Sequence, residues 1–459
     1  MIFSDGRGDI INCNFSPSKI ASMIHVFSEK LTPRVRYAFR LIFETILNNS
    51  VEFHADPDFF SSLEGVKINY SEKTGLGGLT IRPSGLLFES GLQQINIEVF
   101  DWDGLIAFFQ VDHSVIPFDI FSASFYLSTR YEEYFSTERD TLQRFESKSS
   151  LAAKNQFLEK PLVNCWALRL ADVIEQEFER FKFKRSEFSY IPTFDIDNAW
   201  AFKHKGAQRI ILASVNDLVH GRLKTVVQRI SVLLNLEKDP YANYDFMEET
   251  MKFFSFKPFI FLLMNSDGKY DRAISFRNKV FQRLIRELSS FATIGLHPSC
   301  VSNSNTDFLS VEKERLEQVL DRKVELSRQH FLKLSFPETY RNLASAGIVA
   351  DFSMGYADAP GFRASICTPY FFFDLLDERE TLLKIFPFQV MDVTLQKYNK
   401  MNPSDAISKI ESLMQEAAAV GGTFVSLWHN ESLGDAGQWK GWRNVYIEMT
   451  KMASMHSNG

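Results

Sequence analysis

The sequence contains few cysteines for its length. Its 459 residues include four, Cys13, Cys165, Cys300 and Cys367, and no two of them form a C-x-x-C pair. This spacing argues against a disulfide framework and a cysteine-ligated zinc site, and it predicts reduced thiols. The start of the chain also lacks a basic segment followed by an apolar run, so we expect no secretory signal peptide. Both observations favour a cytoplasmic location.

Long apolar runs and an excess of positive charge are absent as well. No segment approaches the roughly 18 uninterrupted apolar residues of a membrane-spanning helix, so we expect no membrane span. The formal net charge is −6, with 51 Lys and Arg against 57 Asp and Glu. Binding to nucleic acid generally needs clustered Lys and Arg. We therefore expect no nucleic-acid partner, and we interpret the basic run 178–185 as a helix end and connector.

The length and the 45% hydrophobic content predict a globular protein of two domains. We place the boundary in the basic connector, which gives domains of residues 1–185 and 186–459. The first is predicted to be an α+β domain, with strands at 66–70 and 94–100 and helices at 123–134 and 162–181. No motif in it indicates a chemistry, and its Arg130, Glu132 and Glu133 are interpreted as a surface or interdomain charge cluster.

The second domain shows a regular alternation of strands and helices. Apolar strands are predicted at 189–195, 259–264, 292–297 and 423–429. Between them, helical patterns occupy 245–254, 277–289, 311–320 and 403–419, with Pro337 at the start of a further helix and Gly347 at its end. This alternation predicts a parallel α/β architecture, either a barrel or a doubly wound sheet.

Acidic and imidazole side chains follow the apolar strands. Chemistry in β/α folds collects at the carboxyl ends of the strands, where the connecting loops converge. A single residue at such a position is usually a turn or capping residue, so only their repeated occurrence points to a site. The candidates are Asp195, Asp197, His297, His330, Asp351, Asp392 and His429.

The pair Asp195 and Asp197 carries the clearest chemical signal. Residues two apart on an extended strand face the same side, and two carboxylates held together repel unless a cation or a proton is shared between them. A divalent cation bound by the two carboxylates would relieve this repulsion. Imidazole ligands from His297 and a second histidine favour zinc or another first-row transition metal.

These segments resemble the NodB-type polysaccharide deacetylases, carbohydrate esterase family four. T-F-D-I-D (residues 193–197) resembles the opening T-F-D-D motif of that family. Gly361-Phe362-Arg363, followed by Thr368-Pro369-Tyr370, resembles its arginine-proline motif, and Leu427-Trp428-His429 resembles its closing motif. The similarity extends over residues 188–450. As a whole, the chain resembles two-domain deacetylase-like proteins of bacterial surface-polysaccharide clusters, which carry the R-Y-E-E-Y segment found here at residues 130–134.

The resemblance implies a distorted, seven-stranded (β/α) barrel that hydrolyses N- or O-acetyl groups on a bacterial polysaccharide or its sugar precursor. It implies a metal-activated water, with Asp195 as the general base and His429 as the acid that protonates the leaving group. Asp197 and His297 would be metal ligands, with Zn the expected ion. Arg363 would orient Asp195. The expected partner is thus a carbohydrate substrate.

Two departures from the family motifs affect the ligand assignment. Ile196 separates aspartates that are adjacent in the family, so the base and ligand roles could be exchanged. The family's H-x-x-x-H motif is here His297-Pro298-Ser299-Cys300-Val301, without the second histidine. We propose that His330 replaces it. Cys300 is the competing ligand because a thiolate also binds transition metals.

Two other functions remain open at this point. A D-x-D strand end also occurs in magnesium-dependent phosphatases of the haloacid dehalogenase type, but there Thr or Val stands where this chain has Ala199, and magnesium prefers oxygen ligands to imidazoles. A glycan-binding protein that kept the fold and lost catalysis is the second alternative. The metal content of the purified protein would distinguish them.

Overall fold

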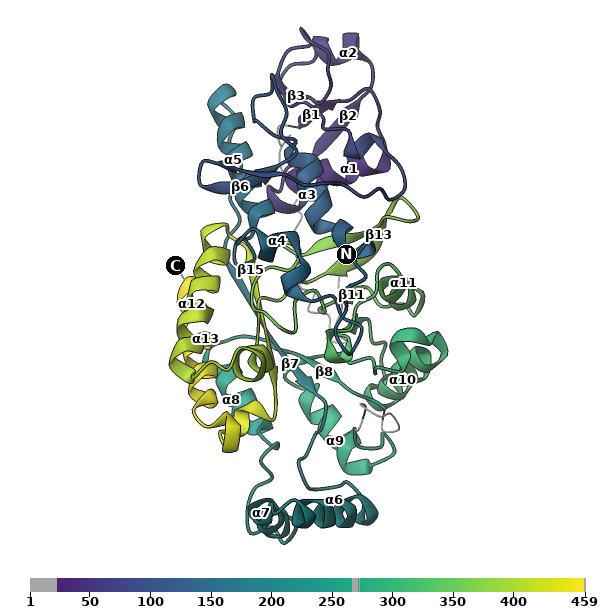
Figure 1. The fold of residues 1–459 in the computed structure, drawn as a ribbon, viewed down its shortest axis with the longest axis vertical. Helices are drawn as coiled ribbons and strands as arrows, with labels where there is room; N and C mark the ends of the chain where they lie inside the picture. Colours follow the sequence, from purple (N-terminus) through teal and green to yellow (C-terminus); the bar gives the residue numbers. More distant parts are fainter. Residues whose placement is uncertain (1–22, 266–270, 272, 458–459) are drawn as a thin grey trace.

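The computed structural model describes residues 23–265, 271 and 273–457. Its first strands form a small sheet at one end of the molecule, at the top of Figure 1, and the larger sheet lies below them. Of the described cysteines, Cys165, Cys300 and Cys367 are free thiols. Cys13 lies outside the described residues.

The small sheet has the strand order β2-β1-β3-β4. Its strands are β1 (Ile24–Phe27), β2 (Val51–His54), β3 (Val66–Asn69) and β4 (Leu79–Thr80), and their pairings are parallel. This differs from the predicted α+β arrangement. The helices α1 (Pro33–Arg40) and α2 (Pro57–Ser62) carry the chain back between successive parallel strands. A separate hairpin, β5 (Val99–Trp102) and β6 (Leu105–Phe108), is antiparallel.

The helices expected in the first domain are present with shifted ends. The helix predicted at 123–134 is split into α3 (Ile120–Ser128) and the short η3 turn (Tyr131–Tyr134). The split occurs because Arg130 adopts the left-handed backbone conformation, with φ +57°. The helix predicted at 162–181 is α5 (Leu162–Glu177). Of the strand predicted at 94–100, only the last two residues lie in β5.

The large sheet has nine strands in the order β12-β13-β11-β10-β9-β8-β7-β15-β14. Its pairings are parallel except that of β12 with β13. The strands are β7 (Ser189–Ile196), β8 (Phe259–Leu262), β9 (Thr293–Leu296), β10 (Leu326–Ser327), β11 (Ala350–Asp351), β12 (Tyr370–Asp374), β13 (Arg379–Ile385), β14 (Val390–Met391) and β15 (Thr423–His429).

This sheet curls around its own small core. Phe261 of β8, Phe352 after β11 and Val425 of β15 belong to one buried cluster, although their strands are not neighbours in the sheet. The short segment 386–389 links the two sides, because Phe386 donates its N–H to Asp351 and Gln389 donates its N–H to Val425. The resulting curled α/β sheet agrees with the predicted architecture in its general form, but it has nine strands and two free ends instead of the seven strands expected for the distorted barrel.

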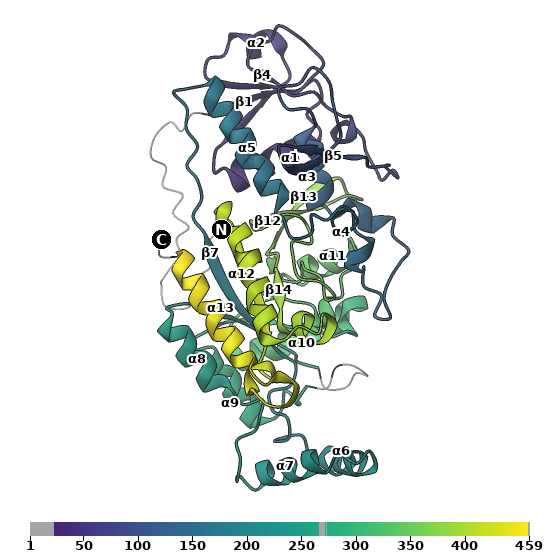
Figure 2. The same cartoon turned by 60° about the vertical axis from the view of Figure 1, so that its left-hand side comes forward.

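Helices pack against the outside of this sheet, and Figure 2 shows α12 and α13 side by side along it. None of the described helices is long and apolar enough to cross a membrane. The predicted helix at 403–419 is confirmed with both ends, whereas α13 was not predicted. The helices are α8 (Tyr244–Phe253), α9 (Lys279–Leu288), α10 (Thr306–Leu320), α11 (Glu338–Ser345), α12 (Pro403–Ala419) and α13 (Trp442–Ser457).

A buried charge cluster joins the two parts of the chain. Glu133 accepts hydrogen bonds from Arg130 (2.8 Å) and from two nitrogens of Arg363 (3.0 and 2.6 Å). All three side chains are at most 3% exposed. Burial raises the pKa of the Glu133 carboxyl, but Arg363 and Arg130 outweigh it and hold the pKa below its usual value. The cluster is therefore buried and not on the surface, and it links residues 130–133 to Arg363 of the large-sheet part of the chain.

Replacing Glu133 by Gln should destabilise the protein strongly. The change leaves the buried guanidinium of Arg363 without its counter-charge, while Arg130 keeps its ion pair with Glu132, and breaking a buried pair typically costs about 3–5 kcal/mol. Chemical denaturation would measure the free energy of unfolding. Glu248→Gln is the matched control, because Glu248 pairs with Lys252 on an exposed helix surface and should change stability by less than about 0.5 kcal/mol. Equal effects of the two substitutions would contradict the interpretation.

Candidate metal centre and active site

The carboxyl ends of neighbouring parallel strands bring the candidate residues together. Asp195 and Asp197 stand at the end of β7, His297 directly follows β9, and His429 ends β15. β15, β7, β8, β9 and β10 are consecutive in the sheet, and Asp195 is paired directly with His429. Parallel alignment therefore places these side chains at one edge of the curled sheet.

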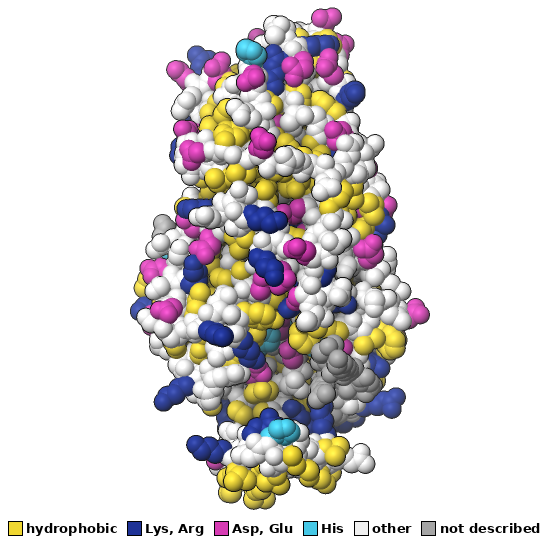
Figure 3. Space-filling view, viewed as in Figure 1, with side chains coloured by type: hydrophobic (Ala, Val, Ile, Leu, Met, Phe, Trp, Pro, Cys, Tyr) yellow, Lys and Arg dark blue, Asp and Glu magenta, His cyan; other side chains and the backbone are white. Residues whose placement is uncertain are grey.

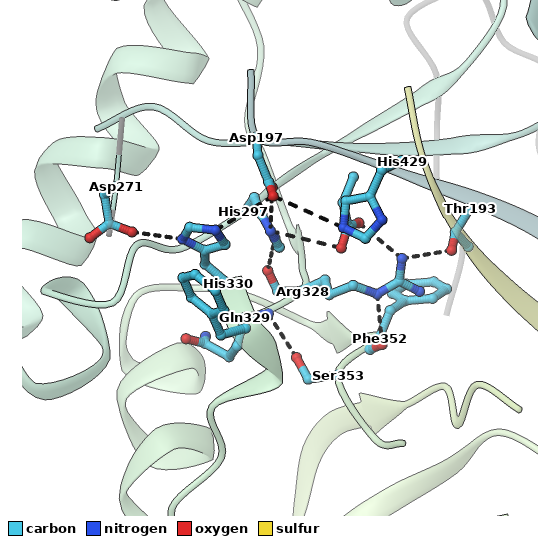
Figure 4. A network of polar contacts seen from close by, with 12 residues as sticks. Thr193, Asp197, Asp271, His297, Arg328, Gln329, His330, Phe352, Ser353 and His429 are labelled. Carbon is cyan, nitrogen blue, oxygen red and sulfur yellow. Dashed lines mark hydrogen bonds and ion pairs between the residues drawn. The ribbon is translucent and has the colours of Figure 1, made fainter. Parts of the chain in front are cut away.

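Three imidazole rings surround the carboxylate of Asp197 (Figure 4). His297 Nε2 lies 3.2 Å from Asp197 Oδ1, and His330 Nε2 lies 3.6 Å from Asp197 Oδ2. His429 Nε2 is 4.0 Å from the same Oδ2. The three rings come from three different strand ends, so the sheet itself holds this arrangement.

Each ring is oriented by an acceptor on its other nitrogen. His297 Nδ1 lies 2.6 Å from the carbonyl oxygen of Arg328, which can only accept a hydrogen bond. His330 Nδ1 lies 2.7 Å from Asp271 Oδ1, and His429 Nδ1 lies 2.8 Å from Asp392 Oδ1. Because the proton of each ring is held at Nδ1, the Nε2 atom faces Asp197. Acceptors of this kind orient imidazole ligands in metal sites.

The charges at the site are strongly coupled. Burial raises the pKa of Asp197, but His330 and His297 outweigh it and hold the pKa well below its usual range. Burial lowers the pKa of His330, but Asp197 and Asp271 raise it well above that of a free imidazole. Burial also lowers the pKa of His429, but the neighbouring Asp392 raises it more strongly, to about 10. The ionised carboxylate of Asp197 therefore stabilises a positive charge placed next to it.

The donor atoms fit a bound cation. Asp197, His297 and His330 each offer one ligand atom, and these atoms lie within 4.8 Å of one another. Asp197 Oδ1 is buried, and although His297 Nε2 lies 3.2 Å away, this oxygen accepts no hydrogen bond of good geometry from the described residues. A buried carboxylate oxygen without a partner costs free energy. Two imidazoles and a carboxylate form a ligand set that is typical of zinc.

The guanidinium beside Asp195 belongs to Arg328, a residue that the motifs had not singled out. Arg328 donates a hydrogen bond of 3.0 Å to Asp195 Oδ1 and one of 2.6 Å to Thr193 Oγ1, and both charged side chains are buried. Arg363, which the resemblance assigned to this role, instead binds Glu133 and the carbonyl oxygen of Gly355. The orienting contact expected from Arg363 is therefore made by Arg328. The reason is geometric, because Arg328 extends across the inside of the curled sheet.

The remaining candidates separate into neighbours of the site and structural residues. Asp392 acts on His429, from which it also accepts a backbone N–H bond of 2.8 Å. Cys300 stands on the far side of His330, grouped with Asp271. Asp351 is fully buried and accepts hydrogen bonds from Ser327 and Ser353, so it does not line the site. Asp271, which holds His330, carries no sequence signal because it follows no apolar strand.

A cavity of about 160 Å³ lies over Asp195, Asp197, His297, His330 and His429. Its apolar wall is formed by Met391, Val393 and Leu427. The first part of the chain contributes one residue, Arg144, which donates to the carbonyl oxygen of Phe331 and to the hydroxyl group of Tyr398. Arg144 also borders a larger adjacent cavity of about 460 Å³. The surroundings of the site are therefore built by both parts.

A second group of potential ligands lies in the small sheet, away from this site. His25 Nδ1 and His54 Nε2 are 3.1 Å apart, with the half-exposed carboxylate of Glu52 3.4 Å from His25. A hydrogen bond between the two imidazole rings explains this contact. In addition, burial lowers the pKa of His54, which favours its neutral form.

Comparison with known proteins gives a family match for the first part only. Residues 24–179 match the model of a family of unknown function, DUF7033. No curated protein matches the chain. Among solved structures, a putative polysaccharide deacetylase from Mycobacterium smegmatis is 14% identical, with a TM-score of 0.38 over 58% of this chain and 85% of its own. A polysaccharide deacetylase from Bacillus cereus is 12% identical, with a TM-score of 0.28 over 58% and 88%.

An allantoinase is similar to the same degree, at 10% identity and a TM-score of 0.34 over 56% of this chain and 83% of its own. Structural similarity at this level does not establish an enzymatic activity. The residues of the site are therefore the basis for any functional assignment.

The buried Asp351 should make the stability of the protein fall as the pH rises from about 4 to about 6. Burial raises the pKa of this carboxyl to about 6, so in that interval the native state binds a proton that the unfolded chain has released. Asp351→Asn should remove this slope, which amounts to about 3 kcal/mol for two pKa units. Denaturant titrations at several pH values would measure it, with the exposed Asp112→Asn as control. An unchanged slope in Asp351→Asn would refute the assignment.

Proposed function

We propose that the chain is a metal-dependent hydrolase that removes N- or O-linked acetyl groups from a carbohydrate. The observation that carries the proposal is the convergence of three imidazole Nε2 atoms on Asp197, each with its Nδ1 held by an acceptor. The motif resemblance over residues 188–450 supplies the substrate class.

Asp197, His297 and His330 would hold the divalent cation, for which zinc fits best. Such an ion, when bound, lowers the pKa of a water molecule and polarises a carbonyl oxygen. Geometry favours His330 over Cys300 as the third ligand, because the Nε2 atom of His330 faces Asp197 and Cys300 lies beyond the ring.

Asp195 is placed to act as the general base. Its carboxylate lines the cavity next to the proposed ligands, and Arg328 holds it in a fixed orientation from inside the sheet. In the proposed reaction, Asp195 accepts the proton of the water that attacks the carbonyl carbon. A fixed carboxylate of this kind contributes by positioning as well as by proton transfer.

His429 is placed to act as the general acid. It lies on the opposite side of Asp197 from His330 (Figure 4) and lines the cavity. Asp392 stabilises its protonated form, so that His429 carries the proton needed by the departing amine or alcohol at neutral pH. Leu427 and Met391 provide an apolar wall that suits the methyl group of an acetyl substrate.

The imidazole-rich site distinguishes this proposal from a magnesium-dependent phosphatase. Magnesium is bound mainly by oxygen ligands, whereas His297, His330 and His429 present nitrogen atoms around Asp197. Elemental analysis of the purified protein would test this directly. A transition metal near one equivalent supports the hydrolase, and a strict requirement for magnesium would refute it.

Removing a proposed ligand should remove the metal. Asp197→Ala, His297→Ala and His330→Ala should each lower the bound zinc from about one equivalent to less than about one tenth, because each deletes one of three protein ligands. Cys300→Ala is the matched control and should retain the metal. Elemental analysis after dialysis measures the result. Retention in His330→Ala together with loss in Cys300→Ala would show that the third ligand is Cys300.

Removing a proposed proton-transfer group should abolish activity while the metal remains bound. Asp195→Asn and His429→Ala should each lower the rate of acetate release from acetylated oligosaccharides by about 10²–10⁴-fold, the usual contribution of a general acid or base. Acetate release and metal content would be measured on the same samples. Near-normal acetate release by either variant would contradict the role given to that residue.

A further inference from the structure

The connection between β7 and β8 contains a helical hairpin that projects from the body of the protein. It consists of α6 (Ala207–Val219) and α7 (Leu223–Leu233), joined by a short turn at Gly221. Figure 1 shows the hairpin at the end of the molecule opposite the small sheet. The buried residues of α8 and α9 already pack in one core with those of β7, β8 and β9, so the hairpin is not needed to cover the sheet there.

The hairpin has its apolar face on the outside. Leu212 is 70% exposed and Val219 is 77% exposed. Along each helix the exposed apolar residues recur at the spacing of a single helical face. On α6 and in the segment from Leu223 to Leu236 they are Ile211, Leu212, Val215, Leu218, Val219, Leu223, Val227, Ile230, Leu233, Leu234 and Leu236.

The inner side of the hairpin carries polar side chains beside one fully buried apolar residue, Val232. Asp217 and Arg229 are buried and form an ion pair between the two helices. Arg229 also donates a hydrogen bond of 3.0 Å to Ser214, and Asp217 accepts a further contact of 2.9 Å from Arg222. This arrangement is the reverse of a helix pair in a water-soluble core, where the apolar stripes face each other. The hairpin is therefore held together by the Asp217–Arg229 ion pair and the buried Val232, and it presents most of its large apolar residues outward.

The charge of this segment is opposite in sign to that of the whole chain. Residues 203–238 contain seven Lys and Arg against two acidic residues, a formal charge of +5 in a chain of −6. Arg222 and Lys224 are exposed next to the turn of the hairpin. Figure 3 shows a hydrophobic surface at the lower end of the molecule, with Lys, Arg and His side chains directly above it.

We infer that the α6–α7 hairpin is an anchor for an anionic membrane surface. Exposed apolar patches of this kind mark interaction sites. A basic polar face combined with outward Leu, Ile and Val residues is the pattern of helices that lie in the interface of a bilayer. The apolar side chains enter the boundary between headgroups and acyl chains, and the surrounding cations contact anionic headgroups. The positive charge distinguishes this occupant from a second copy of the chain, whose hairpin would carry the same charge.

Sedimentation with lipid vesicles tests the inference on the full chain. The protein should bind vesicles of phosphatidylcholine with about one third phosphatidylglycerol, and binding to pure phosphatidylcholine should be at least about tenfold weaker. Leu212→Asp combined with Val219→Asp should reduce binding to the mixed vesicles by at least about tenfold. Lys224→Glu should reduce it by a similar factor, and more at low salt than at high salt.

Leu382→Asp is the matched control, because Leu382 is 74% exposed on β13, far from the hairpin. It should leave vesicle binding unchanged. The substituted side chains are already exposed, so unfolding temperatures should stay the same. Absence of binding to the mixed vesicles, or equal loss in Leu382→Asp, would overturn the inference. So would a dimer in ultracentrifugation that the Leu212→Asp and Val219→Asp substitutions dissociate, if that dimer does not bind vesicles.

Discussion

The carboxylate of Asp197, faced by three imidazole rings, is the interaction on which the arrangement of the site depends. A carboxylate enclosed by side chains in this way keeps its ionised form because positive charge faces it. Each histidine that faces it is fixed by its own acceptor: the Arg328 carbonyl, Asp271 or Asp392. These acceptors lie on separate segments. The loops around the site are therefore constrained by the need to satisfy one anionic group.

A second buried charge cluster couples the two parts of the chain to each other. Glu133 uses both carboxylate oxygens on Arg363, a residue of the segment that closes over the large sheet. Arg144, from the same first part, lines the cavity over Asp197. The part that matches a family of unknown function is thus in direct contact with the surroundings of the candidate site. Through Arg144, this part of the chain forms a portion of the cavity wall.

The sequence predicted the strand ends well and the contacts between them less well. Apolar strands followed by Asp195, His297 and His429 could be found by pattern alone, because strand periodicity and position are local properties. The hydrogen-bond partner of Asp195 could not be found in this way. Arg328 reaches Asp195 across the inside of the sheet, and that contact depends on the register and curl of strands far apart in sequence. Asp271 was missed for the same reason, since it acts only through its contact with His330.

The hairpin α6–α7 shows another limit of pattern analysis. Helical spacing identifies an apolar face but does not tell which way the face points, and here the ion pair of Asp217 with Arg229 turns it outward.

The pairing of β7 with β15 has a consequence for how the molecule is made. β7 carries Asp195, but its neighbour on one side is the strand Thr423–His429, which leaves the ribosome more than two hundred residues later. Until then β7 presents an unpaired apolar edge, which is the kind of surface that promotes aggregation of incomplete chains. Contacts so distant in sequence also form slowly. The sheet therefore stays incomplete during most of the synthesis of residues 189–429, and the site forms only when β15 has been made.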